Sequence, residues 1–259
     1  MSSSVSLLID IGNTRLKWAY LSRGRLQNCS AVLHRQIALQ TYASDAWGSR
    51  QPAQIIVCNV AGENIAKQLS HWSQQHWGIT PRFILAAERG YGVVNAYAEP
   101  RRLGSDRWVA LIAARQIIKQ PACIVDCGSA LTIDAINSNG EHLGGLIVPG
   151  IAMMQRSLGH DTANLSPPHL NQPAHNNRGF QLGRDTDDAI NEGIYQAHSA
   201  LIERTLEELS HTLGSNAVNI ITGGDAPAIL SRLSYLCRHE PEWILQGLAT
   251  IATRAEHTP

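Results

Sequence analysis

The sequence predicts an α/β protein made of two similar halves with a phosphate-binding cleft between them. The main observation is a motif that occurs twice, in which an apolar run ends in an aspartate that is followed by a glycine and an amide or hydroxyl residue. The two copies are Asp10-Ile11-Gly12-Asn13-Thr14 and Asp126-Cys127-Gly128-Ser129-Ala130. A carboxylate at such a turn can hold a cation or a water, and glycine lets backbone N–H groups approach a phosphate. A third glycine-rich turn, Thr222-Gly223-Gly224-Asp225, lies between an expected strand and an expected helix, where N–H groups can meet a nucleotide.

The first half, residues 1–105, is expected to open with a hairpin and to continue with alternating helices and strands. The expected strands are residues 5–9, 16–21, 54–60 and 83–86, and the expected helix is residues 63–77. Gly12-Asn13 is a hairpin turn between the first two strands. The helix is predicted because Ile65, Leu69 and Trp72 recur at helical spacing.

In the second half, residues 106–259, a buried linking helix is expected first and then the strand order restarts. The expected strands are residues 122–125, 131–136, a third one ending at Val148, and 218–221. The expected helices are residues 106–118, 151–158, 186–213, one that starts near Pro227, and 242–255. Asn139-Gly140 predicts the hairpin before the third strand. Residues 161–178, rich in Pro, Asn and His, are expected to form a long loop.

Composition and charge exclude several classes of function. The 21 acidic and 21 basic residues balance, and no basic block stands out, so nucleic acid is not expected as a partner. No stretch reaches the ~18 apolar residues of a membrane span, and the N-terminus lacks the features of a signal peptide. The five cysteines form no CxxC pair and are expected to be buried thiols in a reducing compartment. We therefore expect a soluble, cytoplasmic protein without nucleic-acid or membrane partners.

The first copy of the motif has a further candidate phosphate ligand. Lys17 follows Asp10 at a spacing that lets its ammonium return along the second strand toward a phosphate. The sequence contains neither the GxxxxGK[ST] phosphate loop nor the GxGxxG dinucleotide fingerprint, which argues against those two folds. A hairpin turn without function remains the alternative interpretation of the Asp10 motif when it is taken alone.

The run Gly104-Ser105-Asp106-Arg107 contains a second group of candidate functional residues. Ser105 or Asp106 could simply cap the linking helix, because either side chain can satisfy its free N–H groups. Capping does not explain Arg107, since the macrodipole disfavours a cation at the start of a helix. A carboxylate that can accept a hydroxyl proton, beside a guanidinium that can bind an acid group, suits phosphorylation of a hydroxy acid.

Together these motifs resemble the type III pantothenate kinases, which belong to the acetate/sugar kinase–Hsp70–actin superfamily. The resemblance is carried by Asp10-x-Gly12-Asn13-Thr14-x-x-Lys17, Gly104-x-Asp106-Arg107, Asp126-x-Gly128-Ser129-x-x-Thr132 and Gly144-Gly145-x-Ile147-x-Pro149-Gly150. It covers almost the whole chain. It implies a duplicated, actin-like (ribonuclease H-like) two-domain α/β fold with ATP in the cleft between the halves. It also implies ATP-dependent phosphorylation of pantothenate, the first step toward coenzyme A.

The resemblance also implies roles for single residues. The ATP phosphates would be bound by Asp10, Gly12, Asn13, Thr14, Lys17 and Ser129. Pantothenate would be held by Tyr97, Gly104, Ser105, Asp106, Arg107 and Thr186, with Asp106 as the general base. Magnesium would accompany ATP, and Asp126 would bind a monovalent cation, K⁺ or NH₄⁺. In this family the pantothenate pocket lies at a dimer interface, so a homodimer is expected.

One departure from the family pattern is visible at Ser129, where the family usually has threonine. Both residues carry a hydroxyl, so the ATP contact is expected to survive. Without the resemblance, Thr186 would be interpreted as a helix cap and Tyr97 as an ordinary loop aromatic.

Two alternative functions are left open at this point. The first is a sugar or acetate kinase, or a phosphatase, of the same superfamily; the Gly104–Arg107 run and the short chain both count against it. The second is a non-catalytic regulator that uses the fold to bind a partner protein. The presence of Asp10, Asp106 and Asp126 disfavours a loss of catalysis.

Overall fold

The computed structural model describes residues 5–33, 38–161, 181–214 and 216–254. Its contacts divide the chain into two compact units, Met1–Ile117 with Glu242–Pro259, and Ile118–Pro241. This division differs from the boundary expected between residues 105 and 106. Helix α3 (Ser105–Ala113) and helix α7 (Trp243–Thr253) stay with the first unit because they pack against each other and against its strands. The indole N–H of Trp243 donates to the carbonyl oxygen of Ala110 at 3.2 Å.

The first unit is built on a five-stranded mixed sheet with the order β3-β2-β1-β4-β5. Its strands are β1 (Ser6–Ile11), β2 (Arg15–Ser22), β3 (Arg25–Leu33), β4 (Gln54–Asn59) and β5 (Arg82–Phe83). The first three strands are antiparallel, whereas β4 and β5 run parallel to β1. Leu7, Leu8 and Ile9 of the central strand have no exposed surface, because both faces of the sheet are covered.

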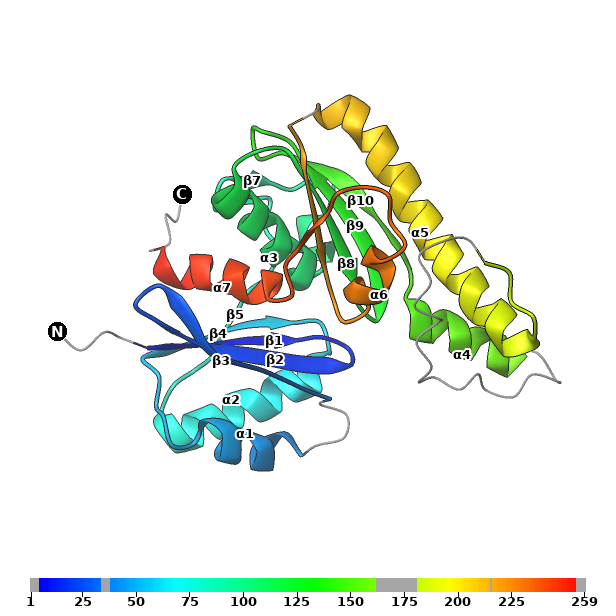
Figure 1. Ribbon diagram of the computed structural model, residues 1–259. Coiled ribbons are helices and arrows are strands. Elements are labelled where there is room, and N and C mark those ends of the chain that lie inside the picture. Colours follow the sequence, from blue (N-terminus) through cyan, green and yellow to red (C-terminus); the bar gives the residue numbers. More distant parts are fainter. Residues whose placement is uncertain (1–4, 34–37, 162–180, 215, 255–259) are drawn as a thin grey trace. The chain divides into compact units, whose positions relative to one another are not determined.

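Helices cover the two faces of this sheet (Figure 1). One face carries α1 (Leu39–Trp47) and α2 (Glu63–Trp77), whose aromatic residues pack on the odd-numbered residues of β1 and β4. The other face carries α3 and α7. Because side chains alternate along a strand, the even-numbered residues of β1 and β4 point toward α3 and α7. The remaining elements of the unit are the β6–β7 hairpin (Arg89–Gly90, Val93–Val94), η2 (Pro100–Arg102) and the π-helical turn η3 (Ala114–Ile118).

The second unit repeats this sheet. Its order is β10-β9-β8-β11-β12, again with three antiparallel strands followed by two parallel ones. The strands are β8 (Ala122–Cys127), β9 (Ala130–Ile136), β10 (His142–Pro149), β11 (Val218–Thr222) and β12 (Arg238–His239). Strands β1 and β8 are both six residues long, have the same pattern of burial, and carry their aspartate at the fifth position. The predicted duplication is confirmed.

Three helices pack with the second sheet: α4 (Ile151–Asp161), α5 (Thr186–Leu213) and α6 (Ala226–Leu230). Ile194, Ile202 and Leu206 of α5 form a core with the odd-numbered residues of β8 and β9. Helix α5 begins with a side-chain cap, in which the Asp185 carboxylate accepts a hydrogen bond from the Asp188 N–H at 2.8 Å. It is therefore Asp185, and not Thr186, that caps this helix.

Most expected elements occur where the sequence places them, and α2 and α5 have the expected ends. The sequence analysis does not predict β3 or α1. Strand β3 lies at the sheet edge with mostly exposed side chains, so no apolar alternation marks it, and α1 is too short for a strong periodic signal. The expected strand at 83–86 is shorter, because β5 ends at Phe83, and the linking helix is α-helical only to Ala113. Of the expected loop at 161–178, Asp161 ends α4 and the rest lies outside the described residues.

A glycine where α7 meets α3 allows a direct test of this packing. A Cβ atom at Gly247 would lie 2.6 Å from both Cγ1 and the carbonyl oxygen of Val109, and that backbone atom cannot move aside cheaply. We expect Gly247→Ala to lower the free energy of unfolding by about 1–3 kcal/mol, measured by urea denaturation. Gly193→Ala in α5 is the control, because a Cβ there meets no atom within 4 Å. The control should be neutral or up to about 1 kcal/mol more stable, since alanine favours a helix over glycine. Equal stability of Gly247→Ala and the unchanged protein would contradict the close α3–α7 packing.

Candidate active site

We call the turns of the repeated motif, Asp10–Thr14 and Asp126–Ala130, the first and second phosphate-type turns. The first of them joins β1 to β2. The N–H of Gly12 donates to the carbonyl oxygen of Arg15 at 3.0 Å and closes the turn, which leaves Asn13 and Thr14 exposed at its tip. Asp10 and Lys17 are direct partners across the two strands. The sequence-predicted phosphate residues of the first motif are thus gathered at one end of the central hairpin.

Asp106 lies in the first turn of α3, but neither it nor Ser105 caps the helix. The N-cap position is Gly104, without a side-chain cap, and an Asp106 carboxylate oxygen accepts instead from the N–H of Arg107 at 2.8 Å. A Cβ atom on Gly104 would lie 2.5 Å from that same oxygen, so a side chain at position 104 would clash with the Asp106 carboxylate. The hydroxyl of Ser105 donates to the carbonyl oxygen of Asn59 at 3.1 Å, which fixes the start of α3 to the end of β4.

A buried thiol, that of Cys58, lies between the strand of Asp10 and the start of α3. Cys58 is the parallel register partner of Asp10, has no exposed surface, and lies 3.4 Å from the Ser105 hydroxyl oxygen. Burial raises the pKa of the Cys58 thiol well above its usual range, and the Asp10 and Asp106 carboxylates raise it further. The pairing of β1 with β4 and the contacts of Ser105 with Cys58 and Asn59 bring Asp10 and the start of α3 into the same region of the first unit. The sequence analysis treated Cys58 only as a small buried residue.

Arg107 is the buried cation of this region. Its residue is 5% exposed, and its guanidinium donates to the Tyr97 hydroxyl at 2.7 Å. The guanidinium carbon also lies 5.6 Å from the centre of the Tyr97 ring, within the range of a cation–π interaction. A buried charge is costly unless it is paired, so the pair marks a place where a positive group is held in position. Tyr97 and Arg107, both predicted from the sequence, are in contact.

The second phosphate-type turn joins β8 to β9 in the second unit. Asp126 lies between Thr132 and Thr222 in the register of the sheet. Gly223 has φ 95° and approaches so closely that a Cβ atom there would lie 2.6 Å from an Asp126 carboxylate oxygen. The N–H of Gly150 donates to the carbonyl oxygen of Ser129 at 3.1 Å. The backbone at Gly223 therefore lies against Asp126, and the backbone at Gly150 lies against Ser129.

The third glycine-rich turn, Thr222–Asp225, is held by hydrogen bonds that were not predicted from the sequence. The N–H of Asp225 donates to the carbonyl oxygen of Cys127 at 3.0 Å, which ties this turn to β8. Behind it, Arg232 forms two hydrogen bonds with the Glu192 carboxylate at 2.8 and 2.9 Å and stacks on the Tyr195 ring. Burial, followed by the Asp225 carboxylate, raises the pKa of Tyr195. Glu192 lies on α5 and Arg232 in the turn after α6, so no local pattern in the sequence marks this pair.

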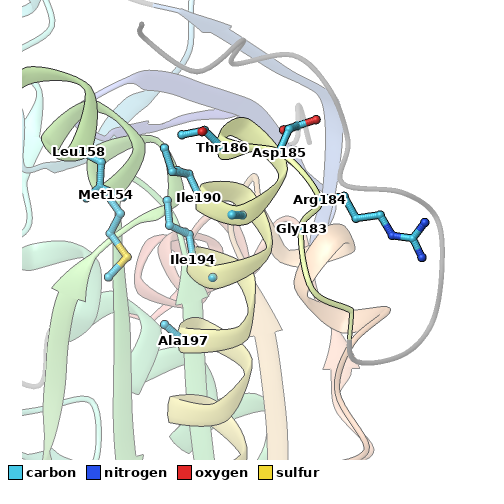
Figure 2. A pocket seen from close by; sticks show the side chains of 11 residues that line it. Met154, Leu158, Gly183, Arg184, Asp185, Thr186, Ile190, Ile194 and Ala197 are labelled. Atoms are coloured by element: carbon cyan, nitrogen blue, oxygen red, sulfur yellow. The ribbon is translucent and has the colours of Figure 1, made fainter. Parts of the chain in front are cut away.

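Thr186 is the first residue of α5 and lines a pocket of about 690 Å³ in the second unit. Figure 2 shows Met154 and Leu158 of α4 facing Ile190 and Ile194 of α5, so the pocket is mainly apolar. Asp10, Tyr97 and residues 104–107 belong to the first unit, whereas Asp126, Ser129 and Thr186 belong to the second.

No group of three or more His, Cys, Asp or Glu side chains in the described ranges is arranged to hold a metal ion. Within the same ranges, no helix is long and apolar enough to cross a membrane.

Solved structures with a similar fold include ATP-binding proteins of the actin type. A proposed Baf family transcriptional activator from Campylobacter jejuni aligns with a TM-score of 0.57 and 23% identity, over 95% of this chain and 96% of that one. MreB 5 of Spiroplasma citri, bound to AMPPNP, aligns with a TM-score of 0.53 and 9% identity, over 97% and 96% of the two chains. At these identities the comparison shows the fold, and the predicted actin-like architecture is confirmed.

Relatives found by sequence are more similar to this chain than these solved structures are. The type III pantothenate kinase of Nitrosococcus oceani is 40% identical over 252 residues, which cover 95% of this chain and 93% of the relative. The enzyme of the same name from Alcanivorax borkumensis is 32% identical over 96% of this chain and 99% of its own length. The sequence profile described as type III pantothenate kinase matches residues 6–208. This chain belongs to the type III pantothenate kinase family.

Proposed function

We propose that this chain transfers the γ-phosphoryl group of ATP to the primary hydroxyl of pantothenate, which gives 4′-phosphopantothenate in the first step of coenzyme A biosynthesis. The observation that carries the proposal is the start of α3, where Asp106 lies beside the buried Arg107 and where Ser105 contacts Cys58, the register partner of Asp10. A proton acceptor, an anion-binding cation and a phosphate-type turn are what phosphorylation of a hydroxy acid requires. Membership of an ATP-dependent kinase family supports the same conclusion.

ATP is bound, in this proposal, by the two duplicated turns. The first unit contributes Asp10, Gly12, Asn13, Thr14 and Lys17, and the second contributes Ser129. Kinases of this family use ATP with a divalent metal, which neutralises charge on the phosphates. A single carboxylate such as Asp10 fits magnesium, which keeps most of its waters and binds mainly to phosphate oxygens.

Pantothenate is bound by Tyr97, Gly104, Ser105, Asp106, Arg107 and Thr186. The Asp106 carboxylate accepts the proton of the primary hydroxyl while that oxygen attacks the γ-phosphorus and ADP leaves. Arg107 binds the pantothenate carboxylate, and its hydrogen bond to Tyr97 orients the guanidinium. Catalysis of this kind depends mainly on positioning and on neutralisation of charge.

All five cysteines are free thiols. Free thiols persist where glutathione and thioredoxin keep them reduced. They support the proposal that the enzyme works in the cytoplasm, where ATP is also supplied.

Asp106→Asn tests the assignment of the general base. An asparagine side-chain oxygen can still accept from the N–H of Arg107, so the fold and ATP binding should be retained. Turnover should fall by about 10²–10⁴, as expected when a general base is removed. The measurement is ADP release in a coupled assay with pantothenate, with a sugar, and without an acceptor.

Three outcomes of that assay would change the conclusion. Pantothenate phosphorylation by Asp106→Asn within about threefold of the unchanged protein would remove the base assignment. Faster ADP release with the sugar would favour a sugar kinase of the superfamily. No acceptor-dependent release by the unchanged protein would favour a non-catalytic regulator.

A monovalent cation, K⁺ or NH₄⁺, is proposed at Asp126. The proposal rests on the family resemblance, and the close approach of the Gly223 backbone to this carboxylate supports it. Turnover in sodium or choline should fall well below turnover in potassium or ammonium, and Asp126→Ala should be slow in all four salts. Equal rates of the unchanged protein in the four salts would leave Asp126 as a magnesium or phosphate residue.

A homodimer is proposed because, by the family resemblance, Thr186 of one chain completes the pocket that contains Asp106 of the other. The apolar residues of α5 are a weaker argument than the sequence analysis expected, since they lie in or against the core of their own unit. Better support comes from β10 and α4, where Leu146, Ile147 and Met153 are 44%, 58% and 42% exposed. Leu146 and Ile147 point to opposite faces of β10, so a two-fold interface would bury one of them on each chain.

Subunit mixing tests the shared pocket. Asp106→Asn and Thr186→Arg should each be inactive alone, and some activity should return after exchange because the mixed dimer keeps one intact pocket. Light scattering should give a dimer at the assay concentration. A monomer, or no recovery despite proven exchange, would rule out the shared pocket.

A further inference from the structure

We propose that His198 is a positioning residue for the nucleotide, which holds the second phosphate-type turn in place through the carbonyl group of Pro149. His198 lies in the middle of α5, and its residue is 3% exposed. Its Nδ1 lies 2.8 Å from the carbonyl oxygen of Ile194, one helical turn earlier, and its Nε2 lies 3.0 Å from the carbonyl oxygen of Pro149. The first contact stays within the helix, whereas the second joins α5 to the end of β10.

Pro149 is directly connected to the turn that carries Ser129. It is the last residue of β10 and pairs with Ala130, the first residue of β9. The following N–H, of Gly150, donates to the carbonyl oxygen of Ser129 at 3.1 Å. A Cβ atom at Gly150 would lie 2.5 Å from the carbonyl oxygen of Gly128, so the two backbones are in close contact. A shift of Pro149 must therefore also shift Ser129.

The hydrogens on the two ring nitrogens of His198 determine which of its two hydrogen bonds can form. A carbonyl oxygen only accepts, so each ring nitrogen that makes its bond must carry a hydrogen. A neutral ring can make one of the two bonds, and a ring with both hydrogens can make both. Positioning requires a hydrogen on Nε2, because only this atom reaches Pro149. The inference rests on the proposed function, since it takes Ser129 to be a nucleotide contact.

Two substitutions separate the two hydrogen bonds. The side-chain N–H₂ of glutamine occupies about the place of Nε2, so His198→Gln can keep the bond to Pro149. The shorter asparagine places its N–H₂ near Nδ1, so His198→Asn can keep only the bond to Ile194. We expect His198→Asn to raise the Kd for MgATP and the KM for ATP about tenfold, the effect of one lost hydrogen bond, with an unchanged KM for pantothenate. His198→Gln should stay within about twofold of the unchanged protein in all three constants.

His142→Asn is the matched control. His142 is also buried in the second unit, on the same strand as Pro149, and its Nε2 lies 2.9 Å from an Asp134 carboxylate oxygen. This variant should lose stability without a selective loss of ATP affinity. The inference is overturned if His198→Asn and His198→Gln have equal ATP constants, or if His142→Asn weakens ATP binding as much as His198→Asn does.

A measurement on the unchanged protein covers the case in which a variant does not fold. A ¹H–¹⁵N NMR spectrum of the imidazole nitrogens identifies which of them carry hydrogen, and a hydrogen on Nε2 is expected. A neutral ring with its hydrogen on Nδ1 alone would overturn the inference. If MgATP binding responds to the variants as expected but pantothenate is not phosphorylated, the proposed substrate is wrong and the role of His198 stands.

Discussion

The central strand of each sheet is buried, and the positions of the site residues follow from this burial. Strand β1 is covered on both faces, so its side chains cannot rotate away and its register with β2 and β4 is fixed. Asp10 sits at the point where this apolar strand ends. Strand β8 repeats the arrangement with Asp126. A carboxylate at the end of a buried strand of fixed register is therefore held at a defined position.

Close backbone contacts then place the remaining groups around these strands. Gly150 and Gly223 let two turns approach the β8–β9 turn to distances that a side chain would prevent. In the first unit, the hydroxyl of Ser105 joins α3 to β4, and Cys58 lies beside Asp10 in the sheet and in contact with Ser105. The charged and polar groups are thus supported by main-chain packing.

The sequence by itself determined the family, the duplication and most of the residues proposed for the site. Apolar runs that end in Asp-x-Gly are visible without coordinates because they combine a buried strand with a turn, and both signals are local. Helices α2 and α5 were predictable to their ends, since α2 has apolar residues at helical spacing, α5 is a long run of good helix formers, and a glycine follows each of them. Asp106 and Arg107 were singled out because a cation at a helix start contradicts the local preference.

The neighbours of these residues became visible in the folded chain. It showed that α7, from the end of the chain, packs with α3, which moved the boundary of the first unit to Ile117. It placed Tyr97 on Arg107, paired Glu192 with Arg232, and brought His198 to Pro149. It also showed that the apolar residues of α5 are covered within their own unit. These contacts join residues far apart in the chain, and local propensity carries no information about which distant partners will meet.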